Sequence, residues 1–149
     1  MSRSELKRAL AQKVPQVARN WRHLADDVLA ELRISNSAGW CLVHLDRMDP
    51  DVRQADLAEE LGITQPSLVR TLHQLEGMGL VERVQNPEDK RSNRVALTAA
   101  GQALAQRIEQ RLSELRRELL EGVPDAAIEI VVNLMELLGR RIAERRQQP

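Results

Sequence analysis

Two short helical patterns separated by a glycine, in the run QADLAEELGITQPSLVRTLHQLEGMGL, constrain the fold more than any other feature of this sequence. Gly62 follows the first pattern and can adopt the positive φ that ends a helix. Thr64 is a suitable N-cap for the second helix, and Pro66 lies in the first turn, where its missing N–H costs no hydrogen bond. A helix, a glycine-containing turn and a second helix predict a helix-turn-helix.

The second of these helices, expected from Thr64 to Met78, has one apolar face and one polar face. Leu68, Leu72 and Leu75 share the side that should pack on the preceding helices. The opposite side carries hydrogen-bonding side chains at helical spacing: Ser67, Arg70, Thr71 and Gln74. This side has no acidic residue, whereas solvated helix faces usually carry Glu and Lys. We therefore expect a binding surface, with an ordinary solvated face as the alternative.

The residues after this helix predict a hairpin of two strands. Apolar and polar residues alternate from Leu80 to Val84 and again from Arg94 to Leu97. The connecting run QNPEDKRSN contains Asn86-Pro87 and a group of charged residues, which is typical of a solvated turn. A helix-turn-helix followed by such a hairpin is a winged helix.

Long helical patterns precede the winged helix. Apolar residues repeat at near-heptad spacing from Leu10 to Val28. Pro15 falls inside this pattern, so the helix either begins near Pro15 or kinks there. Ser35 or Ser37 can cap the next helix, which should end at Asp49-Pro50.

Two further helices are expected after the hairpin. Thr98 can cap the first, whose apolar residues repeat from Leu104 to Leu119, and Gly122 and Pro124 separate it from a last helix that begins at about Asp125. The apolar residues of the last helix cover more than one stripe, so one neighbouring helix cannot bury them all. A partner subunit is the simplest way to cover them.

These elements predict a mainly α protein with a small β-hairpin wing. The length of 149 residues suits one domain. We expect residues 35–98 to form a winged helix-turn-helix core, and residues 4–33 and 99–146 to form flanking N- and C-terminal dimerisation helices. The domain would then span residues 1–149.

Composition excludes several other classes of protein. The formal net charge is zero, so a basic surface for nucleic acid must be local. Cys41 is the only cysteine, which excludes an intramolecular disulfide and agrees with a reducing compartment, the cytoplasm. No apolar run is long enough to span a membrane, and the charged N-terminus does not resemble a signal peptide. We expect no membrane partner.

Catalytic and metal-binding motifs are also missing from the sequence. It contains no glycine-rich phosphate loop, HExxH or GxSxG, and its three histidines lack metal-ligand spacing. We expect no catalytic residue, no metal and no cofactor. Cys41 could sense oxidants, but between Trp40 and Leu42 and without a resolving cysteine it is better interpreted as a buried, inert thiol.

The winged-helix pattern resembles the MarR family of bacterial transcription regulators, and within it the SlyA type. QADLAEELGITQPSLVRTLHQLEGMGLVERV is similar to the helix-turn-helix of the family, DKR to its wing signature, and RVALTAAG to the strand and helix cap that follow. The combination is specific, although each motif alone is weak. The resemblance implies a homodimer that is joined by its terminal helices and reads a pseudo-palindromic double-stranded DNA.

The predicted DNA-binding residues come from the polar helix face and from the wing. Base edges in the major groove offer donors and acceptors to short or fork-shaped side chains, and Gln65 and Pro66 lie where the family meets bases. In the wing, Asp89 should hold the guanidinium of Arg91, which can enter a narrow minor groove. The predicted set is Thr64, Gln65, Pro66, Ser67, Arg70, Thr71, Gln74, Asp89, Lys90, Arg91 and Arg94.

A second group of residues is a candidate effector site. In the family, a pocket between the dimerisation helices and the winged helix takes small aromatic carboxylates or phenols. An indole could stack on such a ligand, and an arginine or histidine could pair with its charge. The candidates are Arg19, Trp21, Arg22, Trp40 and His44. The alternative is structural, because tryptophan is a natural core residue in a chain without Phe or Tyr.

The expected function is therefore sequence-specific DNA binding by a homodimer under the control of a small aromatic or anionic effector. The alternative is a winged helix used for nonspecific DNA architecture or for protein contact, without ligand control. A module of that kind need not discriminate among DNA sequences.

Overall fold

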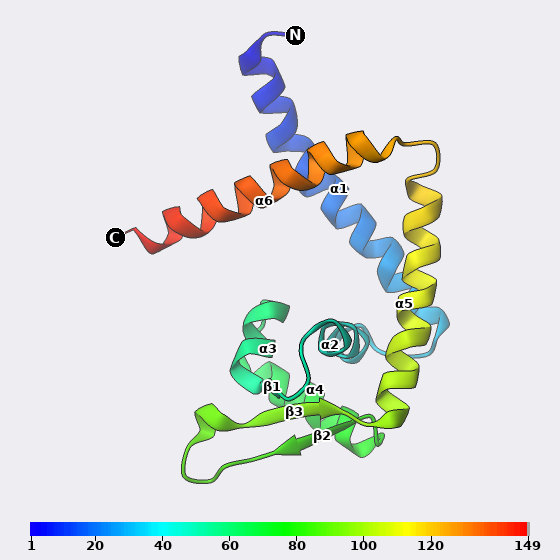
Figure 1. The fold of residues 1–149 in the computed structure, drawn as a ribbon, viewed down its shortest axis with the longest axis vertical. Coiled ribbons are helices and arrows are strands. Elements are labelled where there is room, and N and C mark those ends of the chain that lie inside the picture. The colour runs from blue at the N-terminus through cyan, green and yellow to red at the C-terminus, as the bar shows by residue number, and fades with distance from the viewer. Residues whose placement is uncertain (149) are drawn as a thin grey trace. The chain divides into compact units, whose positions relative to one another are not determined.

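The computed structural model describes residues 1–148, and of Lys90 only the backbone. Figure 1 shows a mainly helical chain with one small sheet, as the sequence predicted. The elements in chain order are α1 (Arg3–Glu31), α2 (Asn36–Arg47), β1 (Val52–Arg53), α3 (Gln54–Leu61), α4 (Gln65–Gly77), β2 (Val81–Val84), the short 3-10 helix η1 (Lys90–Ser92), β3 (Arg94–Leu97), α5 (Ala99–Leu119) and α6 (Asp125–Gln147). The chain forms two compact units, residues 1–115 and the residues from 116 onward.

Local signals determine the ends of the helix-turn-helix, α3 and α4. Gly62 ends α3 with a φ of 66°, a left-handed conformation in which a side chain is strained. The hydroxyl of Thr64 accepts a hydrogen bond from the backbone N–H of Ser67 at the start of α4. Both predictions are confirmed. The side chain of Ser35 caps α2, which decides between the two candidate serines.

The sheet has three antiparallel strands, one more than the predicted hairpin. β3 lies in the centre and pairs with β2 on one side and with the two-residue β1 on the other. Val95 of β3 lies opposite Val52 of β1 and Arg83 of β2. Val52, Val81 and Val95 are buried, so the inner end of the wing is fixed to the core.

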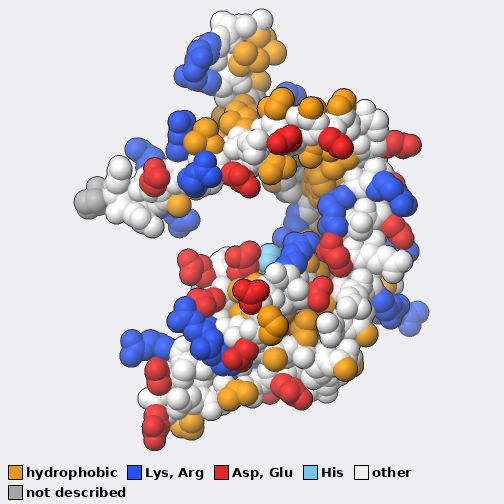
Figure 2. All heavy atoms as spheres, in the orientation of Figure 1, with side chains coloured by type: hydrophobic (Ala, Val, Ile, Leu, Met, Phe, Trp, Pro, Cys, Tyr) orange, Lys and Arg blue, Asp and Glu red, His pale blue; other side chains and the backbone are white. Residues whose placement is uncertain are grey.

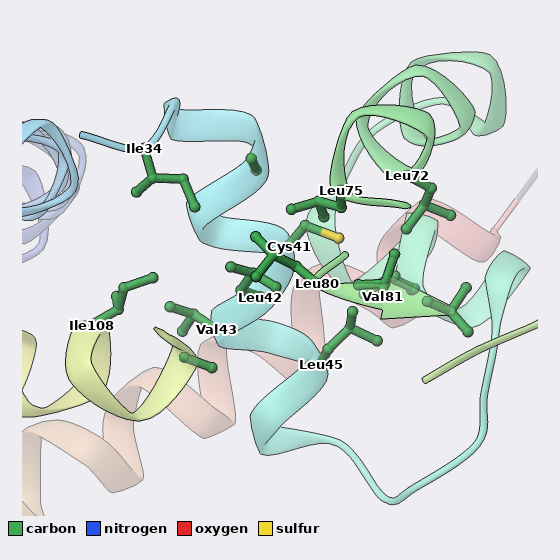
Figure 3. Packing of buried hydrophobic residues seen from close by; sticks show 14 of the residues in the cluster. Ile34, Cys41, Leu42, Val43, Leu45, Leu72, Leu75, Leu80, Val81 and Ile108 are labelled. Carbon is green, nitrogen blue, oxygen red and sulfur yellow. The ribbon is translucent and has the colours of Figure 1, made fainter. Parts of the chain in front are cut away.

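The core is aliphatic and surrounds α2. Leu42 of α2 and Leu72 and Leu75 of α4 are fully buried. Figure 3 shows the labelled side chains of α4 and β2 near one part of α2, and Ile108 of α5 near Val43. Because leucine, valine and isoleucine fill this space, the winged helix needs no Phe or Tyr to bury a continuous core.

The core extends beyond residues 35–98 into the flanking helices. Ala25, Val28 and Leu29 of α1 are buried, and so are Ile108 and Leu112 of α5. These parts of α1 and α5 therefore support the winged helix itself, in addition to any role in dimerisation.

The prediction that the first helix begins near Pro15 is wrong. α1 begins at Arg3, because Ser2 and Glu5 form a capping box in which each side chain accepts a hydrogen bond from the other residue's backbone N–H. The helix continues through Pro15, which deprives the carbonyl of Ala11 of its helical partner. Ala11 is exposed, so water can replace that bond.

Helices α1 and α6 each leave several large apolar side chains in solvent. α6 buries none of its described residues, and Ile130 is 69% exposed. The other exposed apolar residues of α6 are Val131, Val132 and Ile142, and those of α1 are Leu6, Leu10, Val17 and Leu24. Among residues 1–148, no helix is long and apolar enough to cross a membrane.

Candidate nucleic-acid interface

The start of α4 presents a small network of polar side chains. The Ser67 hydroxyl accepts hydrogen bonds from the Thr64 hydroxyl at 3.0 Å and from Nη2 of Arg70 at 3.2 Å. Gln65, Pro66 and Arg70 are exposed, and Ser67 is half-buried. The Arg70 guanidinium is thus held against the helix surface with donors left for a partner outside the chain.

Thr71 does not lie on the exposed face, so that part of the prediction is wrong. Its residue is 7% exposed, and its hydroxyl donates to the carbonyl of Ser67 at 3.3 Å. Thr71 is three residues after Leu68 and four before Leu75, which places it at the edge of the apolar face. Gln74 is exposed, as predicted, and so is His73. His73 was not among the predicted residues, although its helical position, three residues after Arg70, could have indicated it.

The wing tip is held by its own side chains. Oδ1 of Asp89 accepts a hydrogen bond from the backbone N–H of Arg91 at 3.0 Å and lies 3.4 Å from its Nε. The predicted contact between Asp89 and Arg91 is confirmed. The Arg91 side chain is 94% exposed, so its guanidinium is directed into solvent from an ordered turn. The side chain of Lys90 lies outside the described part of the chain.

Arg94, at the start of β3, contacts the chain itself. Its Nη1 donates to the carbonyl of Asp51 at 3.3 Å, which ties β3 to the loop before β1. Arg94 is half-buried. It therefore has a structural partner in addition to its predicted role toward phosphate.

A groove of about 370 Å³ separates α4 from the wing. Val69 and His73 line it from α4, and Asn86 lines it from the wing. Gln54, the first residue of α3, also borders it; this residue is 6% exposed, and its Oε1 has no hydrogen-bond partner among the described residues. The groove means that side-chain packing does not fill the space between α4 and the outer wing.

The second predicted group is only partly assembled. The guanidinium carbon of Arg22 lies 3.7 Å from the ring centroid of Trp40, and Nε1 of Trp40 donates to Oδ1 of Asp26 at 2.8 Å. Nε of Arg22 is 3.6 Å from the same carboxylate oxygen. Asp26 was not predicted, but its spacing of four residues from Arg22 on one helix is a recognisable signal. These contacts fix α1 to α2.

His44 extends this group toward α3. Its ring centroid is 6.4 Å from that of Trp40, and its Nδ1 is 3.7 Å from Oε1 of Glu60. Burial and the nearby charge of Arg47 lower the pKa of His44, and Glu60 opposes this effect. His44 is thus disposed toward the neutral form.

The other two predicted residues do not join this group. Trp21 is half-buried and Arg19 is exposed, and within residues 1–148 neither makes a hydrogen bond, ion pair or ring contact with Arg22, Trp40 or His44. Arg22 and Trp40 have interaction partners within the chain, which agrees with a structural role for these two residues. An anionic ligand would have to compete with Asp26 for Arg22.

Comparisons with known proteins agree with this geometry. The MarR family model matches residues 34–92, from the residue before the α2 cap to the wing. Over these residues the winged helix of this chain is similar to the MarR family. Among solved structures, the transcriptional regulator PA3341 is 29% identical, with 93% of this chain and 99% of that chain covered and a TM-score of 0.78.

Two more distant MarR structures share the fold. An E. coli MarR variant complexed with operator DNA is 24% identical, covers 93% of this chain and 99% of that chain, and has a TM-score of 0.72. Staphylococcus aureus MarR in complex with salicylate and kanamycin is 17% identical, with 94% of both chains covered and a TM-score of 0.81. The mainly helical fold with a small antiparallel sheet is that of MarR-family winged-helix regulators.

Cys41 of this MarR-family fold is unsuited to redox sensing. It is fully buried in α2, and burial raises the pKa of its thiol to about 12. We expect the native protein at pH 8 to resist a disulfide-forming thiol reagent that labels the urea-unfolded protein within minutes. Absorbance of the released thiol measures both rates. Labelling of the native protein as fast as the unfolded one would contradict this assignment.

Proposed function

We propose that this protein is a homodimeric, sequence-specific DNA-binding transcriptional regulator that acts in the cytoplasm on a pseudo-palindromic operator. The observation that carries the proposal is the exposed polar face of α4 beside a wing whose Arg91 side chain is 94% exposed. α4 would lie in a major groove as the recognition helix, and the wing would reach the flanking minor groove.

The distribution of basic residues favours DNA binding by both α4 and the wing. Arg70 is the only arginine or lysine of α4, whereas the sequence of the wing holds Lys90, Arg91 and Arg94. Because the net charge of the chain is zero, attraction for phosphate must come from such local groups. Figure 2 likewise shows positive and negative side chains interspersed over the visible face, without one continuous basic surface. The operator DNA bound to the E. coli MarR variant supports the same partner here.

A second copy of the chain would complete the DNA-binding unit. The exposed apolar residues of α1, and separately those of α6, offer surfaces that another copy could cover. Two recognition helices related by twofold symmetry would then read half-sites about one helical turn, ~34 Å, apart.

We further propose control by a small aromatic or anionic effector and membership of the SlyA type. The subgroup rests on the resemblance of the helix-turn-helix, wing and strand motifs taken together. Salicylate bound to S. aureus MarR supports the ligand class. Trp40 offers a ring face, Arg22 a cationic group and His44 an imidazole that can form a hydrogen bond. Binding that favours one spacing of the two DNA-binding units would shift the population between dimer states.

Selection of bound duplexes from random DNA tests this function directly. We expect a selected pseudo-palindrome, and a gel shift at fixed salt that distinguishes it from a scrambled duplex. Salicylate, as the probe, should alter the affinity for the selected duplex. Equal affinity for selected and scrambled DNA would favour nonspecific architecture instead, and no complex with any duplex would contradict DNA binding altogether.

Replacing Arg91 with alanine should weaken binding to the selected duplex by about 1–3 kcal/mol, the scale of losing one base contact. Because the side chain is 94% exposed, the free energy of unfolding should change little. Titration by gel shift measures the affinity. The control is Arg107→Ala, which removes the same charge from an exposed position on α5; equal affinity of the two variants would exclude the wing from the interface.

A further inference from the structure

Arg83 of β2 connects the wing to the recognition helix through two contacts. Its Nε donates to Oε1 of Glu76, and its Nη2 lies 3.4 Å from Nδ1 of His73. Both partners belong to α4, three residues apart on one side of the helix. The Arg83 side chain is only 5% exposed, so a buried cation joins the two elements that are proposed to meet DNA.

The chemistry of these groups determines which atom donates in each contact. A guanidinium has only donors, so Nδ1 of His73 can pair with Arg83 only as an acceptor. The carboxylate of Glu76 balances the charge of the buried guanidinium, whose removal from water would otherwise be costly. Because the guanidinium is planar, donation to both partners fixes its orientation, and the ammonium of a lysine cannot reproduce this geometry.

The buried part of β2 ends at Arg83. At the inner end of β2, Val81 is 3% exposed, but Val84 is 67% exposed at the outer end. Beyond Arg83, the groove of about 370 Å³ lies between Val69 and His73 on one side and Gln85 and Asn86 on the other. Arg83 is therefore the last buried side chain of β2 before the strand leaves the core.

We propose that Arg83 is a positioning residue that fixes the wing relative to α4, so that Arg70 and Arg91 meet neighbouring grooves of one DNA site together. This inference rests on the proposed DNA-binding function and deepens it. A wing released from α4 would still carry Arg91, but it would have to be ordered when DNA binds. The contribution of Arg91 to affinity thus depends on Arg83.

A double-mutant cycle tests this dependence. Arg91→Ala is expected to weaken binding to the selected duplex about 10-fold in the otherwise natural protein. In an Arg83→Met background, the same change should weaken binding less than about 2-fold, because the wing is already displaced. Arg83→Lys, which keeps the charge, should fail to restore the full effect of Arg91. If Arg83 only stabilised the fold, the losses of binding free energy caused by Arg83→Met and by Arg91→Ala would be additive once the affinity is corrected for the folded fraction.

Two further variants complete the experiment. Glu76→Gln removes the balancing charge and is expected to give an intermediate dependence; its partly exposed position makes it the test if Arg83→Met does not fold. Arg47→Met, which breaks an exposed ion pair with Glu109, is the control and should leave the Arg91 effect at about 10-fold. Circular dichroism gives the folded fraction of each variant.

The outcomes separate the inference from the function on which it rests. Selective DNA binding by the natural protein, with an unchanged Arg91 effect in the Arg83→Met and Glu76→Gln backgrounds, would overturn the positioning role. Absence of selective binding by the natural protein would overturn the proposed function itself.

Discussion

Replacement of Gly101 by alanine is expected to destabilise the protein by about 3 kcal/mol, the upper range for overpacking. A Cβ built at Gly101 would lie 1.9 Å from the carbonyl oxygen of Leu80 and 2.9 Å from its carbonyl carbon. These are backbone atoms, and the Leu80 carbonyl also accepts a hydrogen bond from the N–H of Thr98 at 3.1 Å. Neither Gly101 nor the backbone of Leu80 can move without disturbing the junction of α5 with the wing.

The side chain of Thr98 reinforces this junction. Its hydroxyl donates to the carbonyl of Gly79 at 2.7 Å and accepts from the N–H of Gly101 at 3.0 Å. The glycine of the LTAAG motif is thus required by the close approach of two backbones. Since Leu80 immediately precedes β2, a forced shift should also disturb the position of the wing.

Urea unfolding followed by circular dichroism measures the effect. Gly139→Ala is the matched control, because a Cβ at Gly139, inside α6, meets no atom within 4 Å. Alanine there should be neutral or stabilise by about 0.5–1 kcal/mol through its higher helix propensity. Equal unfolding free energies for the two variants would show that the contact with Leu80 relaxes at little cost.

Most of the fold follows from signals that act within a few residues. The Thr64 cap, the positive φ of Gly62 and the alternation in both long strands are local, and the structure has each of them where the sequence predicted. The third strand, Val52–Arg53, lies outside the predicted hairpin. Its pairing with β3 depends on a partner about forty residues away, which no local pattern specifies.

The predictions that failed depended on balances between neighbouring effects. A start at Pro15 was one of two alternatives for α1, but the capping box at Ser2 begins the helix at Arg3. Thr71 fits a polar helical stripe, yet its short side chain can be buried by donating to the carbonyl of Ser67. Spacing alone cannot decide such cases, because the outcome depends on what packs against each residue.

The contacts that organise the candidate site join different helices and strands and were largely unpredictable. Trp40 meets Asp26 across fourteen residues, and Arg83 meets His73 and Glu76 from a different element. Each joins residue types with many potential partners, so only the assembled fold selects the pair. The sequence therefore shows the polar pattern of the candidate site, whereas the contacts that hold its residues in place are seen only in the structure.

A charge placed on the apolar surface of α6 is expected to have the largest effect on DNA binding. Ile130→Glu should convert the proposed dimer into a monomer and weaken binding to the selected pseudo-palindrome by about 100-fold or more, because linked binding of two half-sites is lost. Ile130 is 69% exposed within one chain. The substitution should therefore leave the fold of the single subunit intact. Sedimentation velocity measures the oligomeric state.

Gln106→Glu is the control for this substitution, since it adds the same charge at an exposed polar position of α5. We expect it to remain dimeric and to bind DNA with little change. Dimeric Ile130→Glu with full affinity would exclude this part of α6 from the interface, whereas a monomeric natural protein would contradict the dimer itself. The same apolar side chains that the single chain leaves in solvent would thus determine whether two winged helices bind DNA tightly, because each offers only a few local basic groups to phosphate.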